Sequence, residues 1–283
     1  MIKKDLKTGF IGAGNMCEAI VGAMVKSGIF HPSMIMVSDI DKNRLDHFEN
    51  LYAVTAIPDN FKLFSESDVV VIAVKPQQIK DVLLAVLKQN NFKLTKRKLI
   101  LSIAAGYSIK KFEDIFYPYI DENSRPDLPI IRVMPNTPAL ALAGMSGMCM
   151  NKFTTDDDAA FARKILETTG KVMDFKEKDF DGITALSGSG PAYLFYLMES
   201  MIKGGVEAGL DHDKASVLAM ETVKGAAALL EQTGEAPEVL RKKVTSPGGT
   251  TEAAIKVFDD NVVKQNIIKG ILAAANRSRE LGK

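Results

Sequence analysis

The stretch that decides the fold is TGFIGAGNMCEAIVGAMVKS, residues 8–27. A short apolar run ends in Gly12 and Gly14, and a helical pattern follows from about Met16 to Ser27. Gly12 permits a tight turn, Gly14 lets the backbone approach a pyrophosphate, and the amino end of a helix attracts anions through its free N–H groups and its dipole. The stretch therefore predicts a strand, a dinucleotide-binding turn and a helix.

Cys17 occupies the third position of the GxGxxG pattern, where glycine or alanine is usual. The side chain is small enough to preserve close packing of the helix on the strand. We therefore interpret it as a buried apolar residue and not as a catalytic thiol. Cys17 and Cys149 are too few for a disulfide framework, and they lack the CxxC spacing of a metal or redox site. No metal is expected.

Short apolar runs alternate with amphipathic stretches through the first half of the chain. The runs are TGFIGAG at 8–14, MIMVSD at 34–39, DVVVIAV at 68–74, KLILSIA at 98–104 and PIIRVMPN at 129–136. Such β-branched, nearly continuous runs are typical of parallel strands that are covered on both faces. Separated by helices, they predict right-handed βαβ units in a doubly wound sheet.

The strand signals stop after about residue 175, and from Gly190 onward the pattern is helical and rich in alanine. We therefore predict the fold class α/β plus all-α. The expected domains are a dinucleotide-binding domain at residues 1–175 and an all-helical domain at residues 176–283.

Composition excludes several classes of partner. The 283 residues carry a net charge of +1, with 46% hydrophobic and 25% charged residues. This balance is ordinary for a globular protein and favours neither a nucleic-acid nor a membrane-surface partner. No uncharged apolar run reaches the about 18 residues of a membrane span, and the amino terminus lacks the pattern of a secretory signal. We expect a cytoplasmic protein.

The end of the second expected strand bears on the choice of dinucleotide. Asp39 lies where an acidic residue would hold the ribose 2′-hydroxyl of NAD. Ser38, Lys42 and Arg44 together would instead suit the 2′-phosphate of NADP, although the two basic residues also fit the solvated face of the following helix. This pattern leaves NAD and NADP both open.

Three further segments place small or polar residues at the carboxyl ends of strands, where open α/β sheets bind ligands. Lys75 and Pro76 follow the run at 68–74, and the sequence LSIAAG at 101–106 provides small side chains beside which a flat ring can lie. Asn136 stands between two prolines. Its amide either caps the turn or donates to a ligand, and both interpretations remain open.

The sequence VTSPGGTTEAAIKVF at 244–258 places two glycines and two threonines ahead of an amphipathic helix. Successive N–H groups beside hydroxyls at a helix start suit an anion of carboxylate size. The alternative is a plain helix cap, with Thr250 or Thr251 capping and Glu252 in the first turn. We favour the anion site because a cap alone needs neither the glycine pair nor both hydroxyls.

The stretch LSGSGPAYLFYLMES at 186–200 fits a phosphate cradle, the turn of a nucleophile or a packing elbow. A serine nucleophile needs a nearby base. The only histidines are His31, His47 and His212, and each lies in a polar, turn-like or exposed context. We therefore interpret the stretch as a packing elbow. The same lack of a base favours reduction of a C=N bond over oxidation of an alcohol.

Five segments in this order resemble the motif series of the pyrroline-5-carboxylate reductase family: FIGAGNM, AVKPQQ, RVMPNTPAL, ALSGSGPAY and VTSPGGTT. The resemblance runs from about residue 8 to residue 281. It implies a Rossmann domain followed by a helical domain that interleaves into dimers, often assembled into decamers. It also implies hydride transfer from NADPH or NADH to the imine carbon of 1-pyrroline-5-carboxylate, which gives L-proline.

The resemblance assigns roles at matching positions. It implies a pyrophosphate turn at 11–16, a cofactor-contacting Asn60, nicotinamide-side loops at 73–76 and 103–105, and a loop at 249–251 that holds the substrate carboxylate. Thr251 is expected to be catalytic, near the ring nitrogen. The substrate-binding residues expected are Ser246, Gly249, Thr250 and Thr251. The cofactor-binding residues expected are Ile11, Gly12, Ala13, Gly14, Asn15, Met16, Asp39, Asn60, Ala73, Val74, Lys75, Pro76, Ile103, Ala104, Ala105 and Asn136.

The sequence departs from the family pattern at Ile40, where many NADPH-preferring members carry an arginine. The resemblance makes NADP(H) the expected cofactor, and the departure at Ile40 leaves NAD(H) as an alternative. Two other functions remain possible on this plan. A β-hydroxyacid-type reductase would need a catalytic lysine, for which Lys203 is the only near candidate. A dinucleotide sensor without turnover would not need the substrate loop.

Overall fold

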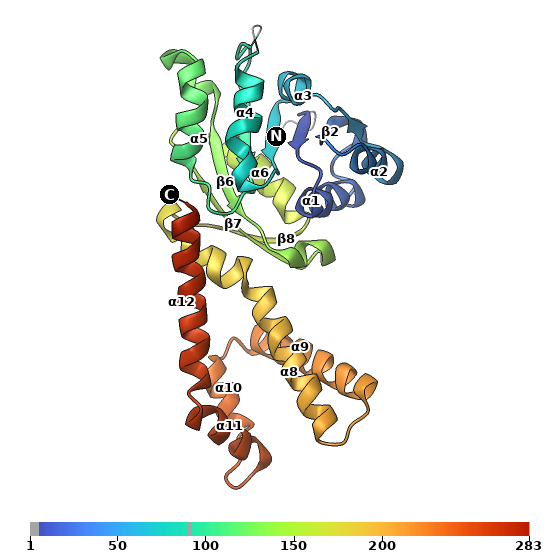
Figure 1. Cartoon of the computed structure of the whole chain (residues 1–283), viewed down its shortest axis with the longest axis vertical. Coiled ribbons are helices and arrows are strands. Elements are labelled where there is room, and N and C mark those ends of the chain that lie inside the picture. Colours follow the sequence, from blue (N-terminus) through green and yellow to red (C-terminus); the bar gives the residue numbers. More distant parts are fainter. Residues whose placement is uncertain (1–5, 90–91, 283) are drawn as a thin grey trace. The chain divides into compact units, whose positions relative to one another are not determined.

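The computed structural model describes residues 6–89 and 92–282. The chain forms two compact units. One contains Met1–Gly188 together with Ala275–Lys283, and the other contains Ser189–Ala274. Figure 1 labels their helices and strands.

The first unit is built on one eight-stranded sheet in the order β3-β2-β1-β4-β5-β6-β7-β8. The first six strands of this order pair in parallel, β7 runs antiparallel to β6, and β8 is parallel to β7. The strands are β1 (Thr8–Ile11), β2 (Ile35–Ser38), β3 (Thr55–Ala56), β4 (Val69–Ile72), β5 (Leu99–Ser102), β6 (Ile130–Met134), β7 (Gly144–Met150) and β8 (Gly170–Asp174).

Helices cover both faces of this sheet. Successive side chains of a strand point to opposite faces, so each strand contributes to two separate hydrophobic cores. Phe10, Val69 and Val71 pack with α1, α2 and α6, whereas Ile11 and Val70 pack with α3, α4 and α5. The helices of this unit are α1 (Asn15–Lys26), α2 (Lys42–Tyr52), α3 (Asn60–Glu66), α4 (Ile79–Leu87), α5 (Ile109–Phe116), α6 (Asp156–Glu167) and α7 (Phe180–Ile183). The predicted doubly wound α/β fold is confirmed.

Three strands, β3, β7 and β8, were not among the predicted runs, and β7 shows why. β7 has the sequence GMSGMCM, without a single β-branched residue, yet it pairs with β6 along Ile131 to Met134. Glycine is required there, because a Cβ on Gly144 would lie 2.9 Å from the Thr169 carbonyl oxygen. Position in the sheet therefore overrides intrinsic strand propensity.

The second unit is helical, as the sequence predicts from Gly190 onward. A π-helical turn at Thr184–Gly188 precedes α8, and α8 and α9 lie side by side (Figure 1). The helices are α8 (Gly190–Glu207), α9 (His212–Thr233), α10 (Pro237–Lys243), α11 (Thr250–Asp260) and α12 (Val263–Leu281). The last turns of α12, from Ala275, belong to the first unit. No helix in the described part of the chain is long and apolar enough to cross a membrane.

Candidate functional site

The site in the first unit lies where the strand order reverses. β1 pairs in parallel with β2 on one side and with β4 on the other. The connection after β1 therefore leads to β2 on one side of this pair, and the connection after β4 leads to β5 on the other side. Backbone hydrogen bonds then join the strand ends: Gly12 N donates to Ser38 O at 2.8 Å, Ala73 N to Ile11 O at 2.9 Å, and Ile103 N to Ile72 O at 3.2 Å. Three segments predicted separately from the sequence thus meet at a topological switch point, where such sheets bind ligands.

Gly12 and Gly14 play different parts in the turn after β1. Gly12 has a φ of +103°, and a Cβ there would lie 2.8 Å from the carbonyl carbon of Ala73. Gly14 precedes α1 without a side-chain cap, and a Cβ there would have nothing within 4 Å. Gly12 therefore shapes the turn, whereas Gly14 leaves open space in front of the amino end of α1. That space suits an anionic group.

Cys17 is buried in the core behind this turn, 1% exposed. Burial raises the pKa of its thiol well above the ordinary value. A thiol that resists ionisation is a poor nucleophile. The structure agrees with the interpretation of Cys17 as a small core side chain.

Asp39 follows β2 and supports the turn. Its Oδ2 accepts a hydrogen bond from Ala13 N at 2.7 Å, and its Oδ1 accepts one from Asp41 N at 3.0 Å. Ser38 is fully buried, and its hydroxyl donates to Asn60 Oδ1 at 2.6 Å. The Ser38 hydroxyl is therefore committed inside the fold, which disfavours its expected part in holding a 2′-phosphate.

Two basic residues were also considered for the phosphate. Lys42 is exposed at the start of α2, whereas Arg44 is held by other groups. Its Nε donates to Ala13 O at 2.8 Å, and its Nη2 pairs with Glu18 Oε2 at 2.6 Å. Glu18 also contacts His47 Nε2 at 2.7 Å. Burial acts against ionisation of Glu18, but the hydrogen bonds from His47 and Arg44 prevail and lower the pKa of Glu18. No local sequence pattern reveals this pairing of Glu18, because its partners lie 26 and 29 residues away.

The remaining cofactor-side residues line the same edge of the sheet. Lys75 is exposed and precedes a 3-10 turn at Pro76–Gln78. Asn15 is exposed, Met16, Val74 and Ala105 are half-buried, and Ala104 is buried. Ala104 and Ala105 provide the small side chains expected for the approach of a flat ring, and the contact of these positions with the cofactor stays a prediction.

Asn136 is engaged within the fold. Its Nδ2 donates to both the carbonyl oxygen and the hydroxyl of Ser187, each at 3.3 Å, and its Oδ1 accepts from Met145 N at 2.9 Å. These bonds tie the connection between β6 and β7 to the segment before α8. The structure thus supports a structural part for Asn136, and its contact with the cofactor stays a prediction.

The segment before α8 is a packing elbow. A Cβ on Gly188 would lie 2.4 Å from Met134 Cε, the end of a flexible side chain, so this segment packs closely against the last residue of β6. Pro191 lies in the first turn of α8, where its missing N–H is harmless. The Ser187 hydroxyl accepts a hydrogen bond from the amide of Asn136, which is no base.

The loop before α11 lies in the second unit. Gly248 has a φ of +73°, and Gly249 precedes the helix without any side-chain cap. Thr250 and Thr251 are the first two residues of α11, so neither is the cap that the alternative interpretation required. The Glu252 carboxylate accepts from Gly248 N at 2.7 Å. The helix start keeps unpaired N–H groups with two hydroxyls beside them.

Comparisons with known proteins cover the whole chain. Residues 177–281 match the family model "Pyrroline-5-carboxylate reductase dimerisation", and residues 7–106 match "NADP oxidoreductase coenzyme F420-dependent". The pyrroline-5-carboxylate reductase of Glycine max is 41% identical over 274 residues, which is 96% of this chain and 95% of the relative. The chain belongs to the pyrroline-5-carboxylate reductase family.

Solved structures of this family agree over the full length. The reductase of Coxiella burnetii matches with a TM-score of 0.86 and 35% identity, covering 99% of both chains. That of Plasmodium falciparum, solved with NADP bound, matches with a TM-score of 0.86 and 28% identity, again over 99% of both chains. The first unit therefore carries an NADP-binding domain. Among the residues described, no group of three or more metal-ligating side chains is found.

Replacing Gly14 by valine is expected to abolish NAD(P)H binding, because the branched side chain fills the open space in front of α1. The thermal midpoint should stay close to wild type, since nothing lies within 4 Å of the new Cβ. Fluorescence titration and calorimetry measure the two effects. Gly12→Ala serves as the comparison variant. It should lower the thermal midpoint, because its Cβ would lie 2.8 Å from the carbonyl carbon of Ala73. Near wild-type affinity in Gly14→Val would place the cofactor elsewhere.

Proposed function

We propose that the chain reduces the imine of 1-pyrroline-5-carboxylate to L-proline with a hydride from NADPH or NADH. The observation that carries the proposal is full-length similarity to the family at up to 41% identity. The turn at the switch point and the loop before α11 supply the two kinds of anion site that this reaction needs. Lys203, the candidate for a β-hydroxyacid reaction, is an exposed residue that pairs with Glu207 at 3.9 Å.

The cofactor, when bound, supplies the hydride. The amino end of α1, opened by Gly14, would hold its pyrophosphate, and Asp39 would lie beside the adenosine ribose. The residues that follow β4 and β5, at 73–76 and 103–105, would flank the nicotinamide. They bind and orient, and no group there exchanges a proton.

At the substrate, backbone N–H groups near Gly249 and Thr250 would hold the carboxylate. Ser246 lies in the same turn, where its carbonyl oxygen accepts from Gly249 N at 3.0 Å. The Thr251 hydroxyl would hydrogen-bond the ring nitrogen. Hydride addition to the imine carbon moves the C=N electron pair onto nitrogen, which keeps or takes up one proton. A basic nitrogen needs no histidine for this step.

We propose that the chain acts as a homodimer, assembled further into a pentamer of dimers. The match of residues 177–281 to a dimerisation model supports the dimer. The second unit also exposes many large apolar side chains, as expected for a surface that another chain covers. They include Leu194, Phe195, Leu197, Val217, Leu218, Leu229, Val257, Phe258, Ile267 and Leu272. The domain boundary at residue 175 and the cytoplasmic location stay predictions.

We propose that NADH serves this enzyme beside NADPH. Ile40 is 97% exposed and brings no charge to the ribose end of the site. Arg44 is already paired with Glu18, and the Asp39 carboxylate would repel a 2′-phosphate. The NADP-binding family match and the relative solved with NADP support NADPH.

The direct test is the purified chain with NADPH or NADH at matched concentrations of 1-pyrroline-5-carboxylate. Oxidation of the nucleotide should require the imine and yield L-proline in equal amount. A chain that binds NADPH but oxidises neither nucleotide with this substrate would be a sensor and not a reductase.

Replacing Asp39 by serine is expected to shift preference toward NADPH. Removing a repulsion of about 1–2 kcal/mol should raise the ratio of kcat/KM for NADPH over NADH about 5- to 30-fold. Asp39→Asn is the matched control, because its amide oxygen still accepts from Ala13 N but carries no charge. If only the serine variant shifts, the lost hydrogen bond and not the charge is responsible. An unchanged ratio in both variants contradicts the ribose contact.

Replacing Thr251 by alanine is expected to lower kcat about 5- to 30-fold, because one neutral hydrogen bond is worth about 1–2 kcal/mol. Thr251→Val keeps the volume nearly constant and should be no better. Disturbing the carboxylate contact near Gly249 should instead raise KM, since that contact acts on ground and transition states alike. Steady-state measurements of kcat and KM for each variant between pH 6 and 9 test these expectations. Wild-type kcat in either variant throughout that range would leave Thr251 without a chemical part.

A further inference from the structure

A pocket of about 320 Å³ lies in the first unit, away from the switch point. It is lined by Phe61, Phe64, Ser65, Phe92, Lys93, Thr95 and Lys98. The first three come from α3, which leads into β4, and the others come from the segment that leads into β5. The pocket therefore lies at the amino ends of parallel strands, whereas the cofactor turn follows the carboxyl end of β1. Nothing in the proposed reaction uses it.

Lys98 forms the charged end of this pocket. The residue is 3% exposed, and its Nζ lies 4.9 Å from the centre of the Phe64 ring. Nζ donates one hydrogen bond, to the carbonyl oxygen of Ser67. Because an ammonium has three N–H donors, two are left without an acceptor among the described residues.

No carboxylate in the described part of the chain pairs with Lys98. Asp68 is the acid whose charge acts on Lys98, but its carboxylate has other partners. Its Oδ1 accepts a hydrogen bond from Lys96, and its Oδ2 accepts one from Lys7 N at 2.9 Å. Burial, with Lys96 acting in the same direction, lowers the pKa of Lys98 to about 8, against the opposing attraction of Asp68. The ammonium still predominates at neutral pH, so the pocket holds a buried cation without a counter-ion. Such charges are normally paired.

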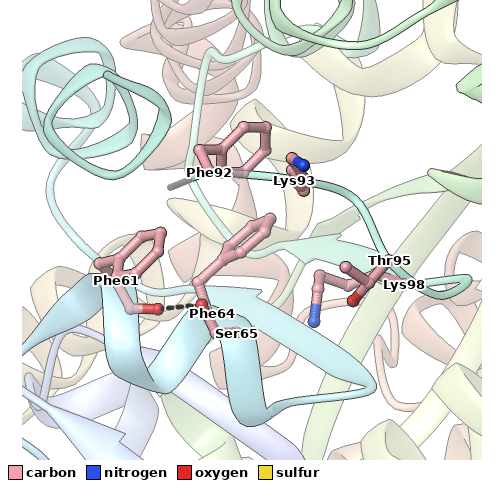
Figure 2. Close-up of a pocket in the computed structure, with 7 residues that line it drawn as sticks. All are labelled: Phe61, Phe64, Ser65, Phe92, Lys93, Thr95 and Lys98. Carbon is pink, nitrogen blue, oxygen red and sulfur yellow. Dashed lines mark hydrogen bonds between the residues drawn. The ribbon is translucent and has the colours of Figure 1, made fainter. Parts of the chain in front are cut away.

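The apolar part of the lining is aromatic. Figure 2 shows the rings of Phe61, Phe64 and Phe92 on one side of the pocket, with Lys93 beside Phe92, and Thr95 and Lys98 on the other side. Aromatic rings in such a cluster favour a flat apolar body that packs against their faces and edges. The volume of about 320 Å³ is at the lower end of the range for small-molecule sites, roughly 300–1,000 Å³.

We propose that this pocket binds a small organic acid with a ring-sized apolar body. Its carboxylate would lie against Lys98, with Lys93 at the exposed rim, and its ring would pack among the three phenylalanines. The carboxylate supplies the counter-ion and the acceptors that Lys98 lacks. The site is separate from the substrate loop, which belongs to the second unit.

Phenylacetate is a suitable probe, with binding followed by calorimetry on the full chain at pH 7. Saturable binding is expected, and Lys98→Met should weaken it about tenfold or more through loss of a charge-assisted hydrogen bond. Phe61→Ala, which removes one wall, should weaken it independently. Lys62→Met is the matched control, because Lys62 is an exposed neighbour on α3 that does not line the pocket. It should bind as the wild type does.

Two measurements on the unmodified chain remove any dependence on how the variants fold. Phenylacetamide, the uncharged analogue, should bind at least about tenfold more weakly than phenylacetate, since it carries no charge to pair with Lys98. Phenylacetate affinity should be steady below pH 8 and fall by up to about tenfold per unit above it, because only the ammonium form binds. Lys93 lines the pocket, and Lys96 and Asp68 act on the charge of Lys98. The other charged residues on the elements around Lys98 are Lys62 and Glu66 on α3 and Arg97.

Several results would overturn the proposal. Equal binding of the acid and the amide would show that Lys98 does not recognise charge. Equal binding to wild type and to both pocket variants would place the probe at another site, such as the substrate loop. Absence of saturable binding by the wild type at millimolar phenylacetate would show that the pocket holds no such acid.

Discussion

The close approach of two backbones, at Gly12 after β1 and at Ala73 after β4, is the constraint on which the rest of the first unit depends. A side chain at position 12 would collide with the Ala73 carbonyl carbon at 2.8 Å. Because the turn is this tight, α1 starts directly above the strand end, and its free N–H groups open onto the switch point. The same geometry brings Ala13 N within 2.7 Å of the Asp39 carboxylate. One steric requirement thus positions both the amino end of α1 and Asp39, the two groups proposed to lie at the pyrophosphate and the ribose.

The charged side chains near Asp39 bear on whether the proposed ribose site accepts NADPH or NADH. Arg44 lies close enough to matter, yet it donates to Ala13 O and pairs with Glu18, which His47 also contacts. A guanidinium that is already paired with a carboxylate binds a 2′-phosphate more weakly than a free guanidinium does, since the phosphate must compete with the existing ion pair. Asp39 adds a negative charge that already serves the turn. The balance between the two nucleotides is therefore a property of this network and not of any single residue.

Much of the fold follows from local pattern, and its failures have a physical cause. The five apolar runs predicted as strands correspond to β1, β2, β4, β5 and β6, because β-branched residues buried on both faces leave a clear signature. β7 left none, since it has no β-branched residue and two of its positions are glycines, of which Gly144 is required by contact with the Thr169 carbonyl oxygen. In the site, spacing alone predicted the glycine turn. The commitment of Ser38 to Asn60 and of Arg44 to Glu18 depends on side chains 22 and 26 residues apart, which no local pattern reveals.

The helical unit faces a different constraint, because it has almost no core of its own. In Ser189–Ala274 the only buried apolar side chains are Ala215 and Ala219, while Phe195, Leu218 and Phe258 are at least half exposed. Ordering each residue costs about 1–2 kcal/mol of backbone entropy, and two alanines offset little of it. Burying one large apolar side chain returns about 1.5–3 kcal/mol. The stability of these helices must then come from surface that another copy of the chain covers, in agreement with the match of residues 177–281 to a dimerisation model.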